Sequence, residues 1–211
     1  MRFMLATGNR HKLGELQQIL APFEVLQMPA WVELPPEDVE SFAANVRDKA
    51  LGLARALAAG PPAAAGPPDL FYLADDSGLE VEALGWAPGV TSARYAGVDG
   101  PGADAANVAR LLREMAGCAG PRARRARFVC SVVAIGPDLT EYTATGHWWG
   151  AIATAPRGAG GFGYDPVFVP EGSDLTVAQW PQADKDQASH RALAGRALLE
   201  GLRREGLHDG G

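Results

Sequence analysis

Two adjacent aspartates, Asp75 and Asp76, are the residues whose types and spacing most clearly indicate chemistry. They directly follow an apolar segment, residues 70–74, which is expected to be a strand. Neighbouring carboxylates repel each other and raise a pKa unless a cation or a role in proton transfer compensates. Carboxylate oxygens are the hard ligands that Mg²⁺ prefers. The pair therefore predicts a Mg²⁺ site with Glu37 or Glu40 as a second acidic ligand; the alternative is a surface turn capped by an aspartate.

A second candidate site lies near the N-terminus, where an expected strand gives way to an expected helix. Backbone N–H groups and the positive end of the helix dipole favour an anion there, and a lysine would add a point charge. The segment lacks the pattern of a Walker A loop, and an ordinary strand–turn–helix junction is the alternative. Its residues are Thr7, Gly8, Asn9, Arg10, His11 and Lys12.

The third candidate is the glycine-rich segment 158–166, which formally matches Gly-x-Gly-x-x-Gly. A dinucleotide-binding turn is rejected because Pro156 precedes it and Pro166 follows where a helix should run. Glycines beside Phe162 and Tyr164 instead allow a flat ligand to approach closely, and an aromatic ring could stack on a nucleobase. A hairpin with core aromatics is the alternative.

The fourth candidate is Lys185 together with Ser189, His190 and Arg191. Ser189 is a suitable N-cap for a last helix, which would place His190 and Arg191 in its first turn. Cations at that position oppose the helix dipole, a mild cost that is easier to explain if they bind a ligand rich in hydrogen-bond acceptors. The alternative is an exposed polar helix start.

The elements that must position these residues follow from hydrophobic periodicity and turn signals. Strands and helices interleave, which predicts an α/β protein with a mixed sheet. Asn9 is the expected N-cap of the first helix, and residues 79–84 alternate in a way that could form an additional strand. Leu193, Ala197, Leu198 and Leu202 are expected to share one face of the last helix. The expected strands are residues 2–6, 23–27, 70–74, 127–135, 142–152 and 168–169, and the expected helices begin near residue 10 and cover 41–58, 105–115 and 189–204.

Composition narrows the class of protein. The 211 residues suit a single domain, 1–211, with two lobes, and 47% hydrophobic with 21% charged residues is ordinary for a globular chain. A net charge of −6 argues against a general nucleic-acid binder but permits a small anionic substrate. Cys118 and Cys130 are too few for a disulfide framework. We expect no signal peptide, no membrane span and a cytoplasmic location.

In their order along the chain, these motifs resemble the Ham1-like family of non-canonical purine nucleoside triphosphate pyrophosphatases. Any one of them is weak, whereas the ordered set is specific and spans nearly the whole sequence. The matching segments are Leu5–Asn9 with Lys12, Glu15 and Leu16; Phe42, Asn45, Lys49 and Ala50; Ala74–Leu79; Ala87–Gly89 and Ser92–Tyr95; Ala126–Phe128; Gly160–Phe168; and Lys185 with Ser189–Arg191.

The resemblance implies an elongated mixed α/β fold, two lobes around a central substrate cleft, and a homodimer. It implies Mg²⁺-dependent hydrolysis of inosine and xanthosine triphosphates, and of their deoxy forms, to monophosphate and pyrophosphate, which removes deaminated purines from the nucleotide pool. Asp76 would hold Mg²⁺ and activate water, with Glu37 as the second metal ligand. Substrate would be bound by Thr7, Gly8, Asn9, Arg10, His11, Lys12 and Lys49 at its phosphate end, and by Phe162, Gly163, Tyr164, Asp165, Lys185, His190 and Arg191 at its base. Ser77 would also touch substrate.

The sequence departs from the family pattern at Ala44, where a glutamate often stands, and in segment 59–69, which looks longer than usual and is expected to be a surface loop. A non-catalytic nucleotide or phosphate sensor is the alternative function, which the presence of a candidate base, Asp76, disfavours. A phosphatase with an aspartate nucleophile would need Asp-x-Asp spacing, whereas Asp75 and Asp76 are adjacent.

Overall fold

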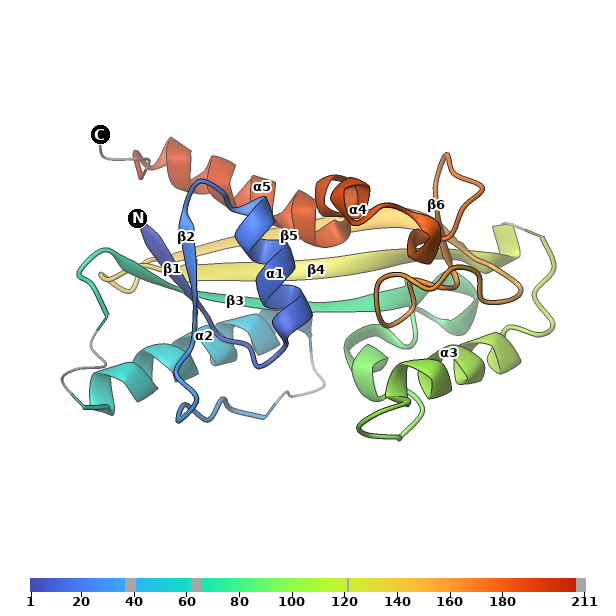
Figure 1. Ribbon diagram of the computed structural model, residues 1–211, viewed down its shortest axis with the longest axis horizontal. Coiled ribbons are helices and arrows are strands. Elements are labelled where there is room, and N and C mark those ends of the chain that lie inside the picture. The colour runs from blue at the N-terminus through green and yellow to red at the C-terminus, as the bar shows by residue number, and fades with distance from the viewer. Residues whose placement is uncertain (37–40, 62–65, 121, 208–211) are drawn as a thin grey trace. The chain divides into compact units, whose positions relative to one another are not determined.

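The computed structural model describes residues 1–36, 41–61, 66–120 and 122–207. Its six-stranded sheet has the order β2-β1-β3-β4-β5-β6 (Figure 1). β1 pairs in parallel with β2 and β3, while β5 and β6 are antiparallel. The predicted α/β class with a mixed sheet is therefore confirmed. The strands are β1 (Arg2–Leu5), β2 (Glu24–Gln27), β3 (Leu70–Val81), β4 (Arg125–Ile135), β5 (Glu141–Ile152) and β6 (Phe168–Pro170); the helices are α1 (Arg10–Ile19), α2 (Phe42–Ala59), α3 (Ala103–Glu114), α4 (Gln182–Ala188) and α5 (His190–Arg204).

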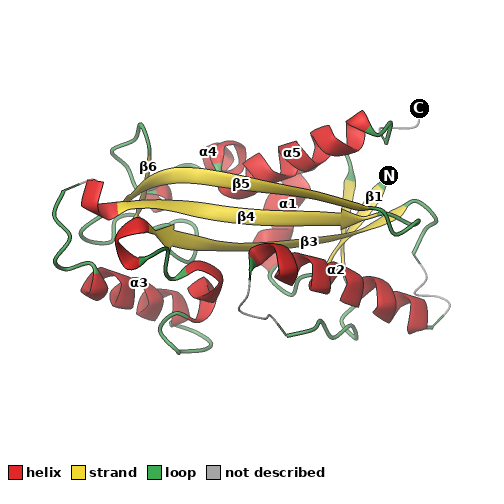
Figure 2. Ribbon diagram, turned by 180° about the vertical axis from the view of Figure 1, so that it is seen from behind, coloured by secondary structure: helices red, strands yellow, loops and turns green. Residues whose placement is uncertain are grey.

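The chain divides into two compact units. The first contains Met1–Asp76, Cys130–Gly146 and Arg191–Gly211; the second contains Ser77–Val129 and His147–His190. The chain passes from one unit to the other four times, within β3, β4 and β5 and at the start of α5. These four elements are labelled in Figure 2. Each unit is described separately below.

Alternation along β1 and β3 builds two cores in the first unit, one on each face of the sheet. Phe3 and Leu5 pack with Phe71 and Leu73 under α1 and α5, whereas the intervening side chains pack under α2. Successive side chains of a strand point to opposite faces, so odd-numbered residues of β3 face α1 and α5 and even-numbered ones face α2. This alternation determines which side chains Asp75 and Asp76 contact.

Two predictions about the middle of the chain are wrong. β3 is one strand that continues through Asp75–Gly78, so the aspartates lie inside it and not at its end. The expected additional strand over residues 79–84 does not exist as such, because residues 79–81 complete β3 and a 3-10 helix, η2 (Glu82–Leu84), follows. The residue types of Asp75–Gly78 are typical of a turn that ends a strand. Both carboxylates have cationic partners, however, which make their burial within the strand possible.

The C-terminal region also differs from expectation. A separate helix, α4, precedes Ser189, and α5 begins at His190. Leu198 and Leu202 are buried as predicted, whereas Ala197 is exposed. Among the described residues, no helix is both long enough and apolar enough to cross a membrane.

Candidate active site

The turn before α1 is fixed by two short polar side chains. Asn9 is the predicted N-cap: its Oδ1 accepts hydrogen bonds from the backbone N–H groups of His11 at 2.9 Å and Lys12 at 3.3 Å. Thr7 Oγ1 accepts from the Asn9 N–H at 3.2 Å. Since these bonds satisfy orphan donors of the helix start, the turn that also contains Gly8 and Arg10 has a defined conformation.

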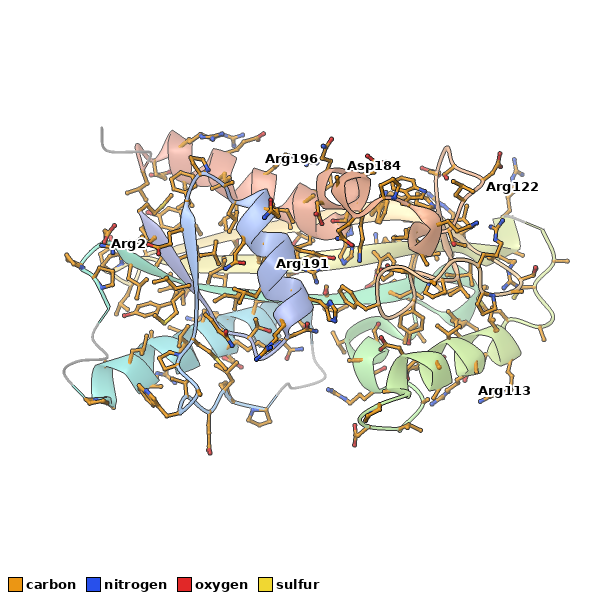
Figure 3. The ribbon with its side chains drawn as sticks, in the orientation of Figure 1. Arg2, Arg113, Arg122, Asp184, Arg191 and Arg196 are labelled. Atoms are coloured by element: carbon orange, nitrogen blue, oxygen red, sulfur yellow. The ribbon has the colours of Figure 1, made fainter. Side chains whose placement is uncertain are left out.

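Asp75 faces α1 and α5 and lies in a buried cluster of charges. Its Oδ2 is 3.1 Å from Lys12 Nζ and 3.1 Å from Arg191 Nε, and Nη1 of Arg191 also contacts Glu15 Oε2. Arg191, labelled at the start of α5 in Figure 3, is 1% exposed. Burial alone would raise the pKa of Asp75, but the charges of Lys12 and Arg191 outweigh it and hold the pKa of this carboxyl far below its usual range.

Asp76 faces α2 and has a different set of partners. Asn45 Nδ2 donates a hydrogen bond to its Oδ2 at 2.8 Å, and Lys49 Nζ is 3.7 Å from its Oδ1. Asn45 and Lys49 are four residues apart on α2, so both lie on the helix face that covers the strand. The Asp76 carboxylate, with 6% of its side chain exposed, is thereby held by one amide and one ammonium.

The first unit offers part of a site for a hard cation. Asp75 Oδ1 is buried and accepts no hydrogen bond from any residue that the structure describes. Such an unmet carboxylate oxygen needs a cation or an ordered water. The Asp76 carboxylate offers hard oxygens on the opposite face of the sheet. No group of three His, Cys, Asp or Glu side chains within the described ranges could hold a metal alone. Glu37 and Glu40, the predicted second ligands, lie outside the described residues.

In the second unit, the glycine-rich loop presents Phe162 in a fixed position. Asp165 Oδ2 accepts a hydrogen bond from the Phe162 N–H at 2.9 Å and pairs with Lys185 Nζ at 2.7 Å. The same ammonium lies over the Phe162 ring, 4.3 Å from its centroid, within the range of a cation–π contact. Gly161 and Gly163 flank the ring with φ of 71° and 61°, a left-handed conformation that favours glycine.

His190 and Tyr164 are also anchored within the second unit. The His190 ring stacks on Phe128 with centroids 4.7 Å apart and an interplanar angle of 11°. Tyr164 is buried and donates a hydrogen bond from its hydroxyl to the Ser92 carbonyl at 2.9 Å, and burial raises the pKa of the Tyr164 hydroxyl. Stacking and this hydrogen bond therefore restrict the orientation of both rings.

The predicted site residues fall into two groups. The first unit brings together Asp76, Lys49, Lys12 and Arg191 with the turn of residues 7–12, whereas Ser77, residues 162–165, Lys185 and His190 belong to the second unit. Glu15 and Asn45 complete the charge clusters, and neither has a predicted role. Apart from their place in the family-matching segments, neither residue carried a signal, because a glutamate or asparagine on a helix is usually solvated.

Comparison with known proteins identifies the family of this chain. The model of the Ham1 family matches residues 3–201. A dITP/XTP pyrophosphatase from Nocardia farcinica is 44% identical over 206 residues, covering 95% of this chain and 94% of the relative. One from Ralstonia nicotianae is 44% identical over 207 residues, covering 96% of each.

Solved structures show the same fold. The Ham1 protein of Staphylococcus aureus superposes with a TM-score of 0.80 at 33% identity, covering 97% of this chain and 100% of that one. A Mycobacterium abscessus structure, titled nucleoside-triphosphatase / dITP/XTP pyrophosphatase, gives a TM-score of 0.69 at 39% identity and covers 95% and 98%. With the family model and these relatives matching over nearly the whole length, the chain belongs to the Ham1 family.

Proposed function

We propose that this chain hydrolyses the triphosphates of inosine and xanthosine, and their deoxy forms, to a nucleoside monophosphate and pyrophosphate. The names of its relatives support the substrate class. The observation that carries the proposal is the pair of buried aspartates in β3, each facing a lysine on a different helix. Such an arrangement supplies cations for phosphate oxygens and a carboxylate for proton transfer.

At the phosphate end, we assign binding of the triphosphate to residues 7–12 and Lys49. The described ion pairs balance on each face of the sheet: Lys12 and Arg191 face Asp75 and Glu15 on one side, and Lys49 faces Asp76 on the other. A triphosphate adds several negative charges to a cluster that is already neutral. The balance therefore supports a requirement for an additional cation at this site.

That cation is proposed to be Mg²⁺, held by Asp76 with Glu37 as a second ligand. Bound Mg²⁺ would neutralise charge on the triphosphate oxygens and favour in-line attack. Asp76 is proposed to take the proton from the attacking water, and its carboxylate is oriented for this by the Asn45 amide and Lys49. Lys12 would stabilise the charge that develops on the departing pyrophosphate.

At the base end, Phe162 is proposed to stack on the purine, while Gly163, Tyr164 and Asp165 shape the pocket around it. Ser77 is proposed to touch the substrate. Lys185, His190 and Arg191 are proposed to donate hydrogen bonds to the 6-oxo group of hypoxanthine or xanthine. Adenine carries a 6-amino donor there, which would leave buried donors unpaired and so be rejected. Arg191 has five N–H donors, so its pairing with Glu15 and Asp75 is compatible with contact to a base.

A homodimer in the cytoplasm remains part of the proposal. The dimer comes from the family resemblance. Sedimentation equilibrium over a hundredfold range of protein concentration measures it: a mass near the 22.1 kDa of one chain at all concentrations would contradict a dimer.

The activity is tested by incubating the protein with Mg²⁺ and the triphosphates of inosine, xanthosine, adenosine or guanosine, with pyrophosphate and inorganic phosphate measured separately. We expect pyrophosphate from the first two nucleotides. Asp76→Asn should lower kcat by roughly 10²–10⁴-fold, the contribution of a general base. Asp69→Asn, at an exposed aspartate of the same unit, should retain full activity.

Each other outcome has a distinct meaning. Binding of inosine triphosphate without turnover supports a sensor. Inorganic phosphate without pyrophosphate supports a phosphatase. Equal rates on all four nucleotides contradict the base-reading roles of Lys185, His190 and Arg191, and full activity without a divalent cation contradicts the metal requirement.

A further inference from the structure

One edge of α3 holds two loops of the second unit (Figure 1). Asn107, which is 2% exposed, accepts a hydrogen bond on Oδ1 from the Ala96 N–H at 2.6 Å and donates from Nδ2 to the Ala93 carbonyl at 3.0 Å. These bonds fix the end of η3 (Gly89–Arg94) and the residues that follow it. Residues three apart on a helix share a face, so Asp104 extends the same polar edge toward the helix start.

Asp104 reaches the glycine-rich loop. Its Oδ2 accepts a hydrogen bond from the Gly163 N–H at 2.7 Å, across 59 residues of sequence. Hydrogen bonds to an ionised acceptor are shorter and stronger than neutral ones. Gly163 directly follows Phe162 and has a φ of 61°, so the bond holds the backbone where the chain turns back from the aromatic ring.

Two other bonds to this loop have partners later in the sequence. Gly160 N–H donates to the Ala178 carbonyl at 3.0 Å, and Lys185 pairs with Asp165 at 2.7 Å. η5 (Val177–Gln179) and α4 supply those partners, whereas α3 supplies Asp104. The segment with Phe162 is thus held between partners before and after it in the sequence.

We propose that Asp104 is a positioning residue for the base-binding loop: by holding Gly163 it keeps the Phe162 ring ready to stack on a purine. This inference rests on the proposed function, in which Phe162 contacts the base. Asp104 itself touches no reacting atom, so its loss should weaken substrate binding and leave the chemical step unchanged.

The test uses the full-length protein and two substitutions at one position. Asp104→Ala removes the acceptor, whereas Asp104→Asn keeps an acceptor oxygen without its charge. We expect Asp104→Ala to raise KM for inosine triphosphate about tenfold, the equivalent of one charge-assisted hydrogen bond, with kcat within about twofold. Asp104→Asn should restore most of the affinity, with KM within about threefold of wild type.

A matched control removes the same kind of charge elsewhere. Asp184, labelled in Figure 3, is an exposed aspartate in the first turn of α4 of the same unit, so Asp184→Ala loses an equivalent interaction with a helix dipole. We expect no change in KM. Amide hydrogen exchange at Gly163 provides a readout independent of activity: it should speed up in Asp104→Ala and remain slow in Asp104→Asn and Asp184→Ala.

The outcomes separate this inference from the proposed function. If the wild-type protein turns over no inosine or xanthosine triphosphate, the proposed function fails, while exchange at Gly163 still tests the role of Asp104. Unchanged exchange and KM in Asp104→Ala overturn the inference. So does a fall in kcat without a rise in KM, or an Asp104→Asn variant as impaired as Asp104→Ala.

Discussion

Asp75 and Asp76 avoid mutual repulsion because consecutive side chains of β3 point to opposite faces of the sheet. Asp75 meets Lys12 and Arg191 on one face, and Asp76 meets Asn45 and Lys49 on the other. Each carboxylate therefore has its own neutralising partners. A shift of β3 by one residue would turn each carboxylate toward the partners of the other. The arrangement of charges therefore depends on the register of this strand.

Removing one charge from a buried cluster leaves its partners uncompensated. We expect Asp75→Asn to lower the free energy of unfolding at pH 7 by about 3–5 kcal/mol, the usual cost of breaking a buried ion pair. Urea denaturation followed by circular dichroism measures this change. Asp69→Asn is the control, because Asp69 pairs with Arg2 at the surface, where ion pairs contribute little to stability. Equal losses of stability in the two variants would contradict a stabilising role for the buried ion pairs of Asp75.

At this scale, residue chemistry predicted an anion site with Lys12 and a metal site at the aspartate pair, and the family resemblance added Lys49. The structure places Lys12, Lys49 and Asp76 in one unit. Glu15 was beyond prediction, since a glutamate on a helix is usually solvated and its pairing partner Arg191 lies 176 residues away. Composition and periodicity carry no information about such a long-range pair.

Two glycines of α5 show how this helix meets α1. A methyl group added to Gly195 would lie 2.5 Å from Ile19 Cγ2, whereas one added to Gly201 would meet nothing within 4 Å. Arg191 precedes Gly195 by four residues, and Glu15 precedes Ile19 by four. Residues at this spacing share a helix face, so the close approach at Gly195 lies on the same interface as the Arg191–Glu15 ion pair.

Substitution of these glycines by alanine should therefore have opposite effects. Gly201→Ala should stabilise the protein by about 0.5–1 kcal/mol, because alanine is the better helix former. Gly195→Ala should destabilise it by about 1–3 kcal/mol through overpacking and should lower turnover as Glu15 and Arg191 move apart. Thermal unfolding and kcat of both variants check this; a stabilised Gly195→Ala protein would show that α1 and α5 can separate without cost.

The elements were predictable where periodicity was strong. β4, β5 and α2 match their predicted ranges closely. β4 has a long run of buried side chains, β5 buries alternate residues in its second half, and α2 buries residues at helical spacing. α4 was missed because Gln182–Ala188 is mostly polar and offers no apolar stripe. β3 was divided in error because turn-forming residue types occur inside it, and only the tertiary ion pairs explain why they remain extended.

At the scale of the whole molecule, two of the crossings between the two units lie inside predicted site motifs. One crossing separates Asp76 from Ser77, and another separates His190 from Arg191. Motifs that are continuous in sequence therefore contribute to both units. Neither unit is a continuous segment, so truncation cannot isolate one of them, and stability measurements concern the full chain.

Acid should unfold the protein partly through Asp75. In an unfolded chain an aspartate titrates near pH 3.9, whereas Lys12 and Arg191 hold the pKa of Asp75 far lower in the folded state despite the opposing effect of burial. As the pH falls below about 5, the unfolded state therefore binds this proton first, and the stabilisation from the carboxylate is progressively lost. Above that pH this group contributes a constant amount.

The Asp75→Asn variant measures how much the Asp75 carboxylate contributes to the free energy of unfolding at each pH. The difference in free energy of unfolding between wild type and Asp75→Asn should be constant from pH 8 to about 5 and should shrink as the pH falls toward 3, because the asparagine cannot titrate. Urea titrations at each pH measure it, at concentrations of salt held fixed since screening acts on exposed charges more than on buried ones. A difference that stays constant down to pH 3 would mean that Asp75 has an ordinary pKa in the folded protein, and that Lys12 and Arg191 do not neutralise it there.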